Sequence, residues 1–318
     1  MHTLLGISSL LFTLVGGFFL LAVLKHVNDW SQRRTFHLII LTMPLLTLGV
    51  GVDGLYHLIW HLCLVRVPFW DLLFGIIVSF ALEVIAVGAC VLALVRLVVI
   101  TLLMKRRCLP ATSELQHHVA SLAQHLQVPS PPILLYASAH PLALTSGILH
   151  PTIVLSPWML EHLDAQELDA VLTHELGHIA RHDMLVIWLA TLLRDAFFYL
   201  PTSRIAYRAL QYEKELMCDD LSIRVTQRPL DLASALAKVW LNTLEESPLF
   251  STTLAQPLVG AEAAINGRIE RLLNEKERIL KQHPPVLAFQ IKALSGCILL
   301  IVQALNLIIL VILMHCLP

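Results

Sequence analysis

His174-Glu175-Leu176-Gly177-His178, which ends an amphipathic run that starts at Asp164, is the stretch that decides the fold of this chain. Asp164 and Glu167 have the spacing of a capping box, so we predict that a helix begins there. Residues four apart share one face of a helix, and the imidazoles of His174 and His178 would therefore converge on one point. Neutral imidazoles bind zinc, and Glu175 would lie beside that point as a general base. The alternative is a helix with two ordinary surface histidines.

Composition predicts a membrane protein. Of the 318 residues, 57% are hydrophobic and only 14% are charged, whereas about a quarter of the residues in soluble domains are charged. The net charge of −1 gives no reason to expect direct binding of nucleic acid. The cysteines form no C-x-x-C pair, and we interpret most of them as small core residues. Cys218 is one residue off the helical face that would serve a metal.

Four apolar runs predict membrane spans, at 3–24, about 38–60, about 72–103 and 294–314. Basic residues gather in the first loop and directly after the third run, and this bias places the region after Lys105 in the cytoplasm. We therefore predict the following domains: three transmembrane helices in 1–104, a cytoplasmic domain in 105–285 and a C-terminal transmembrane helix in 286–318.

The polar-patterned middle region predicts an α+β domain. Its helices are expected at 112–127, around the histidine motif, and at 204–227, 232–244 and 261–280, and its strands at 133–137, 142–145 and 152–156. The apolar run 184–200 contains Arg194 and Asp195, so a buried or membrane-surface helix is favoured there over a further span.

A third metal ligand is expected from the stretch 212–220. Catalytic zinc usually has three protein ligands and one open position. Glu215 and Asp219 are four apart and share one helical face. Glu215 would bind the metal, and Asp219 would accept a hydrogen bond from the N–H of a ligand imidazole.

Together these motifs resemble the BlaR-type family of bacterial integral-membrane zinc metallopeptidases, which are gluzincins. The resemblance is carried by the histidine motif with Arg181 and Asp183, by 213–219, by 268–273 and by the order of the spans. It implies a mostly α, multi-span membrane protein with a gluzincin-type α+β zinc protease domain between the third and last transmembrane helices. A similarity to the HtpX/CAAX-protease family is the second match, and that family differs in where its spans fall.

The resemblance also implies roles for individual residues. His174, His178 and Glu215 would bind one Zn²⁺ per chain, Glu175 would be the base, and Asp219 would orient a ligand. The family's substrate lies as an extended strand along an edge strand, which here corresponds to Leu142, Ala143, Leu144, Thr145, Ser146 and Gly147.

The expected function is a zinc endopeptidase of the bacterial inner membrane, with its protease domain in the cytoplasm. Its partners would be membrane lipid and a protein substrate, for example a transcriptional repressor or another signalling protein, and a homodimer is left open. The chain stops at Pro318, so the penicillin-binding sensor domain of the family's β-lactam transducers is expected to be absent. A quality-control or processing protease is the first alternative. A non-enzymatic membrane sensor is the second, and the intact ligand and base set argues against it.

Three further groups of polar residues have weaker interpretations. Asp53, His57 and His61 share one face of the second apolar run and are interpreted as polar contacts between helices. The mixed charges of 268–281 are interpreted as a solvated face. Candidates for a group that stabilises the transition state are Tyr199, Tyr207 and His182.

Overall fold

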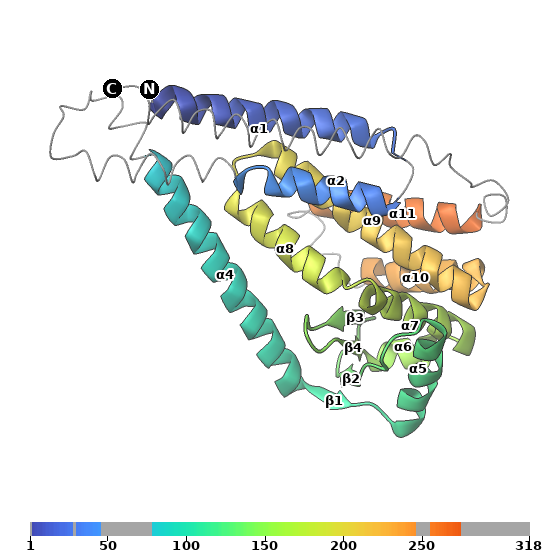
Figure 1. The fold of residues 1–318 in the computed structure, drawn as a ribbon. Helices are drawn as coiled ribbons and strands as arrows, with labels where there is room; N and C mark the ends of the chain where they lie inside the picture. Colours follow the sequence, from blue (N-terminus) through green and yellow to red (C-terminus); the bar gives the residue numbers. More distant parts are fainter. Residues whose placement is uncertain (1, 28–29, 46–77, 246–254, 275–318) are drawn as a thin grey trace. The chain divides into compact units, whose positions relative to one another are not determined.

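The computed structural model describes residues 2–27, 30–45, 78–245 and 255–274. The chain divides into two compact units. The first comprises 1–96, 189–210 and 284–318, and the second comprises 97–188 and 211–283. Figure 1 shows a mostly helical chain with one small sheet.

In the first unit, helix α1 (His2–Leu24) packs against α2 (Trp30–Thr42). Leu20, Phe36 and Ile40 are among the buried residues of this pair. Gly17 lies so close to Thr202 that an added Cβ would be 3.0 Å from the threonine methyl carbon. A larger residue at position 17 would therefore push these two segments apart.

The second unit contains a four-stranded sheet. Its strands are β1 (Cys108–Pro110), β2 (Ile133–Tyr136), β3 (Ala143–Ser146) and β4 (Thr152–Leu155), in the order β1-β2-β4-β3. Strands β2 and β4 are parallel, and the other two pairs are antiparallel. Among the strands that the structure describes, β3 is thus an edge strand, which pairs with β4 alone. Gly147 follows β3 with φ +93°, where a Cβ would collide with the His150 carbonyl oxygen, so this turn requires glycine.

Helices α5 (Ser113–His125) and α7 (Ala165–Ala180) pack with this sheet (Figure 1). Their common core is made of buried apolar side chains: Val119, Ala123, Ile133, Ile153, Leu155, Leu172, Leu176 and Ile179. Short helix α6 (Pro157–His162) leads into α7. Helix α4 (Val78–Arg107) precedes β1. The motif helix is therefore a central, buried element.

Helices α8 (Asp183–Ala196) and α9 (Pro201–Thr226) belong in part to each unit, whereas α10 (Pro229–Glu245) and α11 (Ala255–Leu273) lie in the second. Helix α10 contacts both α7 and α11. Ala170 of α7 and Leu272 of α11 belong to one buried cluster with Ile223, Leu232 and Ala233. Helix α11, which was predicted at 261–280, thus reaches the neighbourhood of the motif helix.

The start of α7 confirms the predicted capping box. The Asp164 carboxylate accepts hydrogen bonds from the backbone N–H groups of Gln166 and Glu167, at 2.8 Å each. The Glu167 carboxylate accepts from the backbone N–H of Asp164 at 2.9 Å. Glu167 also binds Ser234 and Lys238 of α10, at 2.6 Å each, and so fastens α10 to the first turn of α7.

The prediction of a multi-span membrane protein is contradicted. Across the described ranges, no helix combines the length and the apolarity needed to cross a bilayer. Of the second predicted span, 38–60, the structure describes only 38–45, where α2 ends at Thr42 after 13 residues, or about 20 Å at 1.5 Å per residue, against a hydrocarbon core of about 30 Å. The last predicted span, 294–314, lies outside the described residues, as do Asp53, His57 and His61.

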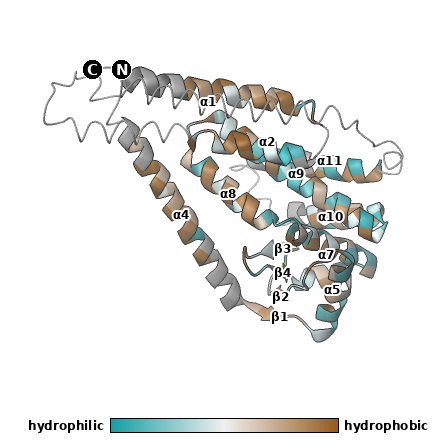
Figure 2. Cartoon of the chain, viewed as in Figure 1, coloured by the Kyte–Doolittle hydropathy of each residue, from teal (hydrophilic) through white to brown (hydrophobic). Residues whose placement is uncertain are grey.

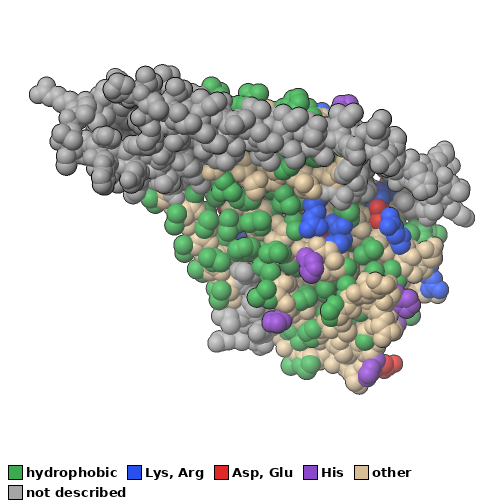
Figure 3. Space-filling view, viewed as in Figure 1, with side chains coloured by type: hydrophobic (Ala, Val, Ile, Leu, Met, Phe, Trp, Pro, Cys, Tyr) green, Lys and Arg blue, Asp and Glu red, His purple; other side chains and the backbone are tan. Residues whose placement is uncertain are grey.

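Apolar side chains are nevertheless exposed on two helices, α1 and α4, whose ribbons are largely coloured as hydrophobic where they are described (Figure 2). They include Val15 and Phe18 on α1 and Val87 and Leu92 on α4. Hydrophobic side chains also occupy much of the described surface in Figure 3.

Candidate metal centre

Helices α7 and α9 bring three potential ligands together. His174 Nε2 lies 3.4 Å from Glu215 Oε2, and His178 Nε2 lies 3.9 Å from Glu215 Oε1. One donor atom from each residue lies within 4.8 Å of the other two. The imidazole rings are nearly perpendicular, with their centroids 4.9 Å apart. The two histidines are buried, whereas the Glu215 side chain keeps 29% of its exposure and is the most exposed of the three.

A carboxylate engages the other nitrogen of each imidazole. His174 Nδ1 lies 3.0 Å from Asp219 Oδ1, and His178 Nδ1 lies 3.1 Å from Asp183 Oδ2. Asp219 is fully buried and Asp183 nearly so. A carboxylate at Nδ1 favours the tautomer that carries its proton on that nitrogen, and this leaves the lone pair of Nε2 free to bind a metal. Both Nε2 atoms therefore face Glu215 as potential metal ligands.

The donor set fits zinc. Two imidazole nitrogens and one carboxylate are ligands of the catalytic zinc sites that keep a fourth position open. Ligand bonds near 2.0–2.1 Å in a tetrahedral site place neighbouring donors about 3.3 Å apart, close to the 3.4 Å between His174 and Glu215.

Two cations border the cluster. Arg268 of α11 is 8% exposed. Its Nε and Nη2 donate to the two carboxylate oxygens of Asp219, at 2.8 and 2.6 Å, and its Nη1 donates to Glu215 Oε2 at 3.2 Å. Lys214 Nζ lies 3.0 Å from Glu215 Oε1. The Arg268 guanidinium thus joins the predicted ligand to the carboxylate that orients His174.

These contacts shift the proton equilibria of the cluster. Burial is the largest influence on His174 and acts to lower its pKa, but the hydrogen bonds to Asp219 and Glu215 outweigh it and raise the pKa to about 9. Burial also acts against ionisation of Glu215, yet the nearby His174 and Lys214 hold the pKa of that carboxyl well below its usual range. The metal-free centre therefore keeps a proton on His174 beside an ionised Glu215.

Cys218 forms a second group of potential donors with His178 and Asp183. Its Sγ lies 3.0 Å from His178 Nδ1 and 3.5 Å from Asp183 Oδ2, and all three residues are buried. Burial raises the pKa of the Cys218 thiol far above its ordinary value. Because the thiolate is the form that binds metal, the neutral thiol makes this group the poorer site. The interpretation of Cys218 as off the relevant face overlooked its contact with the back of His178.

Glu175 lies beside the cluster and contacts the sheet. Its side chain is buried, and the hydroxyl of Thr145 in β3 donates to Glu175 Oε2 at 2.8 Å. The same hydroxyl lies 3.1 Å from the backbone carbonyl oxygen of Glu175. The predicted base is therefore held against the edge strand.

The structure thus gathers the predicted residues from three elements: His174, Glu175 and His178 of α7, Glu215 and Asp219 of α9, and Thr145 of β3. Tyr207 lies in the other unit, where its hydroxyl accepts from Thr191 and Arg194 stacks on its ring. His182 is exposed in the turn after α7, at φ 53°.

Arg268 and Asp183 were missed as contributors to the site. The prediction of a solvated face at 268–281 is wrong for Arg268, which is buried. Asp183 stood in the quoted motif without a role, although its position five residues after His178 was a usable signal.

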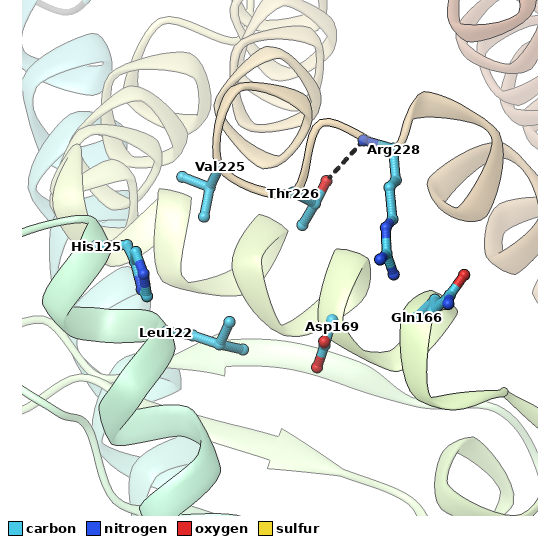
Figure 4. A pocket seen from close by; sticks show the side chains of 7 residues that line it. All are labelled: Leu122, His125, Gln166, Asp169, Val225, Thr226 and Arg228. Carbon is cyan, nitrogen blue, oxygen red and sulfur yellow. Dashed lines mark hydrogen bonds between the residues drawn. The ribbon is translucent and has the colours of Figure 1, made fainter.

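A separate pocket lies among α5, α7 and the junction of α9 and α10, and shares no residue with the metal cluster (Figure 4). Its lining mixes polar and apolar side chains: Leu122, His125, Gln166, Asp169, Val225, Thr226 and Arg228. The Thr226 hydroxyl accepts from the backbone N–H of Arg228 at 3.3 Å and shapes that corner.

Comparison with known proteins finds a family match over most of the chain. A family model described as BlaR1 peptidase M56 matches residues 73–272. The regulatory protein BlaR1 of Bacillus licheniformis is 30% identical over 89 residues, which cover 28% of this chain and 15% of that protein. A protease HtpX homolog of Aquifex aeolicus is 36% identical over 84 residues, which cover 26% of this chain and 28% of that protein.

Other matches are longer but weaker. A protease HtpX homolog of Lactobacillus helveticus is 26% identical over 171 residues, which cover 40% of this chain and 57% of that protein. The matches therefore span less than two thirds of these relatives. The crystal structure of S. mikatae Ste24p aligns with a TM-score of 0.44 at 18% identity, over 60% of this chain and 58% of that one, a likeness too weak to define the fold.

Proposed function

Because the chain belongs to the BlaR1 peptidase M56 family, we propose that it is a zinc-dependent endopeptidase whose metal is held by His174, His178 and Glu215. The observation that carries the proposal is the convergence of these three donors at the centre of a buried helix pair, with Glu175 beside them. The family resemblance stated from the sequence is confirmed by the family match.

Three carboxylates beside the ligands, those of Glu175, Asp219 and Asp183, have parts in the proposed hydrolysis. Bound zinc would supply Lewis-acid activation of water and of the scissile carbonyl. Glu175 takes a proton from the attacking water and delivers it to the leaving amine. Asp219 and Asp183 hold the two imidazoles in the tautomer and orientation that direct Nε2 inward.

The substrate is proposed to bind along β3. Within the described part of the chain, this strand pairs only with β4, so its other edge offers backbone N–H and C=O groups to an extended polypeptide. Thr145 connects the same strand to Glu175. A peptide added to β3 would therefore lie beside the base. Protein substrates with an extended, accessible segment suit this arrangement.

We propose regulatory cleavage as the biological role, because one matched relative is a regulatory protein. A cytoplasmic repressor is the proposed substrate, and this requires the centre to face the cytoplasm. The matched HtpX proteases favour a second candidate, cleavage of damaged or unprocessed proteins. Breadth of substrate choice separates the two roles.

The test of activity compares the purified chain with Glu175→Gln. Both proteins would be stripped of metal by a chelator, reloaded with zinc and incubated with unfolded casein. Glu161→Gln, an exposed glutamate of α6, is the matched control. We expect hydrolysis by the parent and by the control, its loss after chelation and return with zinc, and none by Glu175→Gln. Zinc-dependent hydrolysis that survives in Glu175→Gln would contradict the proposal.

The test of the role uses the same variant as a substrate trap. Glu175→Gln and the parent would be captured from the native host, and co-purifying proteins identified by mass spectrometry. One or two DNA-binding proteins enriched with the variant would support regulatory cleavage. A broad set of proteins would support quality control instead.

A further inference from the structure

The Thr145 hydroxyl makes specific polar contacts with Glu175, the predicted base. Its side chain lies on strand β3 and is 5% exposed. The hydroxyl oxygen is 2.8 Å from Glu175 Oε2 and 3.1 Å from the backbone carbonyl oxygen of the same residue. Both acceptors belong to α7, so the hydroxyl is directed at the helix from the sheet.

We propose that Thr145 is a positioning residue that holds the Glu175 carboxylate in its reactive orientation; this inference rests on the proposed function. A hydroxyl has one proton to donate, and an ionised carboxylate oxygen is a stronger acceptor than a backbone carbonyl. The hydroxyl therefore donates to Oε2 and fixes the rotation of the carboxylate. Oε1 is then the oxygen that receives the proton from water.

The position of Thr145 in the sheet gives this contact a second consequence. Side chains alternate between the two faces of a strand, so Thr145 is directed toward α7 while Leu144 and Ser146 are directed the other way. Thr145 pairs with Ile153, which is fully buried in β4. The residue that holds the base thus sits in the strand that would hold the substrate backbone. One rigid connection sets the distance between base and scissile bond.

Threonine is suited to both tasks. Its branched Cβ favours the strand conformation, and its hydroxyl supplies the donor. Valine keeps the branched shape and loses the hydroxyl, whereas serine keeps the hydroxyl and loses the methyl group. The pair Thr145→Val and Thr145→Ser therefore separates the donor from the shape. Thr152→Val is the matched control, because Thr152 lies in β4 and its hydroxyl donates to the His150 carbonyl at 3.3 Å.

The test measures kcat and KM of the zinc-loaded full chain on a fluorogenic peptide that the parent cleaves, with zinc content and thermal unfolding measured in parallel. We expect Thr145→Val to lower kcat by about 10- to 100-fold, with KM nearly unchanged and zinc retained. Thr145→Ser should recover most of the rate, and Thr152→Val should match the parent. If Thr145→Val does not fold, Thr145→Ala against Thr145→Ser gives the same contrast.

A double-mutant cycle tests whether Thr145 acts through Glu175. Adding Thr145→Val to Glu175→Gln should cause little further loss of residual hydrolysis, because the amide is already the wrong group. An equal further loss in both backgrounds would overturn the inference. Full kcat in Thr145→Val beside an inactive Glu175→Gln would also overturn it and leave the proposed function standing. A parent chain without hydrolysis would overturn the proposed function, and the inference with it.

Discussion

Zinc binding is predicted to expel a proton from His174. In the metal-free chain this imidazole lies between Asp219 and Glu215, which raise its pKa to about 9 against the opposing effect of burial. Zinc needs the Nε2 electron pair of the neutral ring. The carboxyl groups of Asp219 and Glu215 have lowered pKa values and are already ionised at pH 7. The proton therefore comes from His174 rather than from the carboxylates.

The magnitude follows from the distance between the solution pH and that pKa. At pH 7 the ring is about two units below its pKa of about 9, so about 99% of metal-free molecules carry this proton. Protons and zinc compete for His174 Nε2, and each unit of pH then changes the apparent free energy of zinc binding by about 1.4 kcal/mol. Between pH 7 and pH 8 the apparent zinc affinity should rise about tenfold on account of His174.

A calorimetric titration and a chelator competition check this prediction. Titration of zinc at one pH in buffers of different ionisation enthalpy gives the number of protons released, and competition with a chelator gives the affinity at pH 7 and pH 8. Asp219→Asn removes the charge that holds the proton, so the release assigned to His174 should diminish. No release together with an affinity independent of pH would refute the reasoning.

Three other predictions concern stability. The pKa of His174 is raised from 6.5 to about 9 in the folded metal-free chain. The protonated ring therefore contributes its full share to the free energy of unfolding below pH 6.5, and this share is lost as the pH rises through 9. Urea denaturation at several pH values should show the free energy of unfolding falling by about 3 kcal/mol over that window. Arg268→Met leaves the buried Asp219 carboxylate without its cation and removes one of the two cations beside Glu215, so it should cost about 3–5 kcal/mol in the same assay. Arg224→Met on the exposed face of α9 should cost little. Glu167→Gln weakens the hydrogen bonds of this side chain to α10 and to the first turn of α7, so it should lower the free energy of unfolding by about 1–3 kcal/mol. Glu161→Gln is the control. Equal unfolding midpoints of Glu167→Gln and the parent would show that this carboxylate contributes nothing.

The local pattern was enough to predict the centre of the fold. The spacing of His174 and His178, with the capping box at Asp164, placed a helix where α7 lies. Helical spacing likewise placed Glu215 and Asp219 on one face of α9, and the structure directs both to His174. Such predictions succeed because a helix converts sequence spacing into spatial proximity.

The contributions from distant elements could not be predicted in this way. Arg268 is 53 residues beyond Glu215, and its helix alternates charged and apolar residues like any solvated helix. Only the packing of α11 decides which of its arginines is buried. Thr145 was placed in a strand correctly, but nothing in that strand's pattern names a partner on α7. The prediction of membrane spans rested on apolar composition, and composition does not fix where a helix begins and ends, as the end of α2 at Thr42 shows.

The ligands of the bound metal test the central claim most directly. Zinc-edge X-ray absorption of the reloaded chain distinguishes nitrogen and oxygen donors at about 2.0–2.1 Å from a sulfur donor at about 2.3 Å. The proposed centre of His174, His178 and Glu215 predicts nitrogen and oxygen donors alone, with a spectrum that is unchanged in Cys218→Ala. A sulfur donor that disappears in Cys218→Ala would place the metal on the other face of His178, beside Asp183, and would contradict the account.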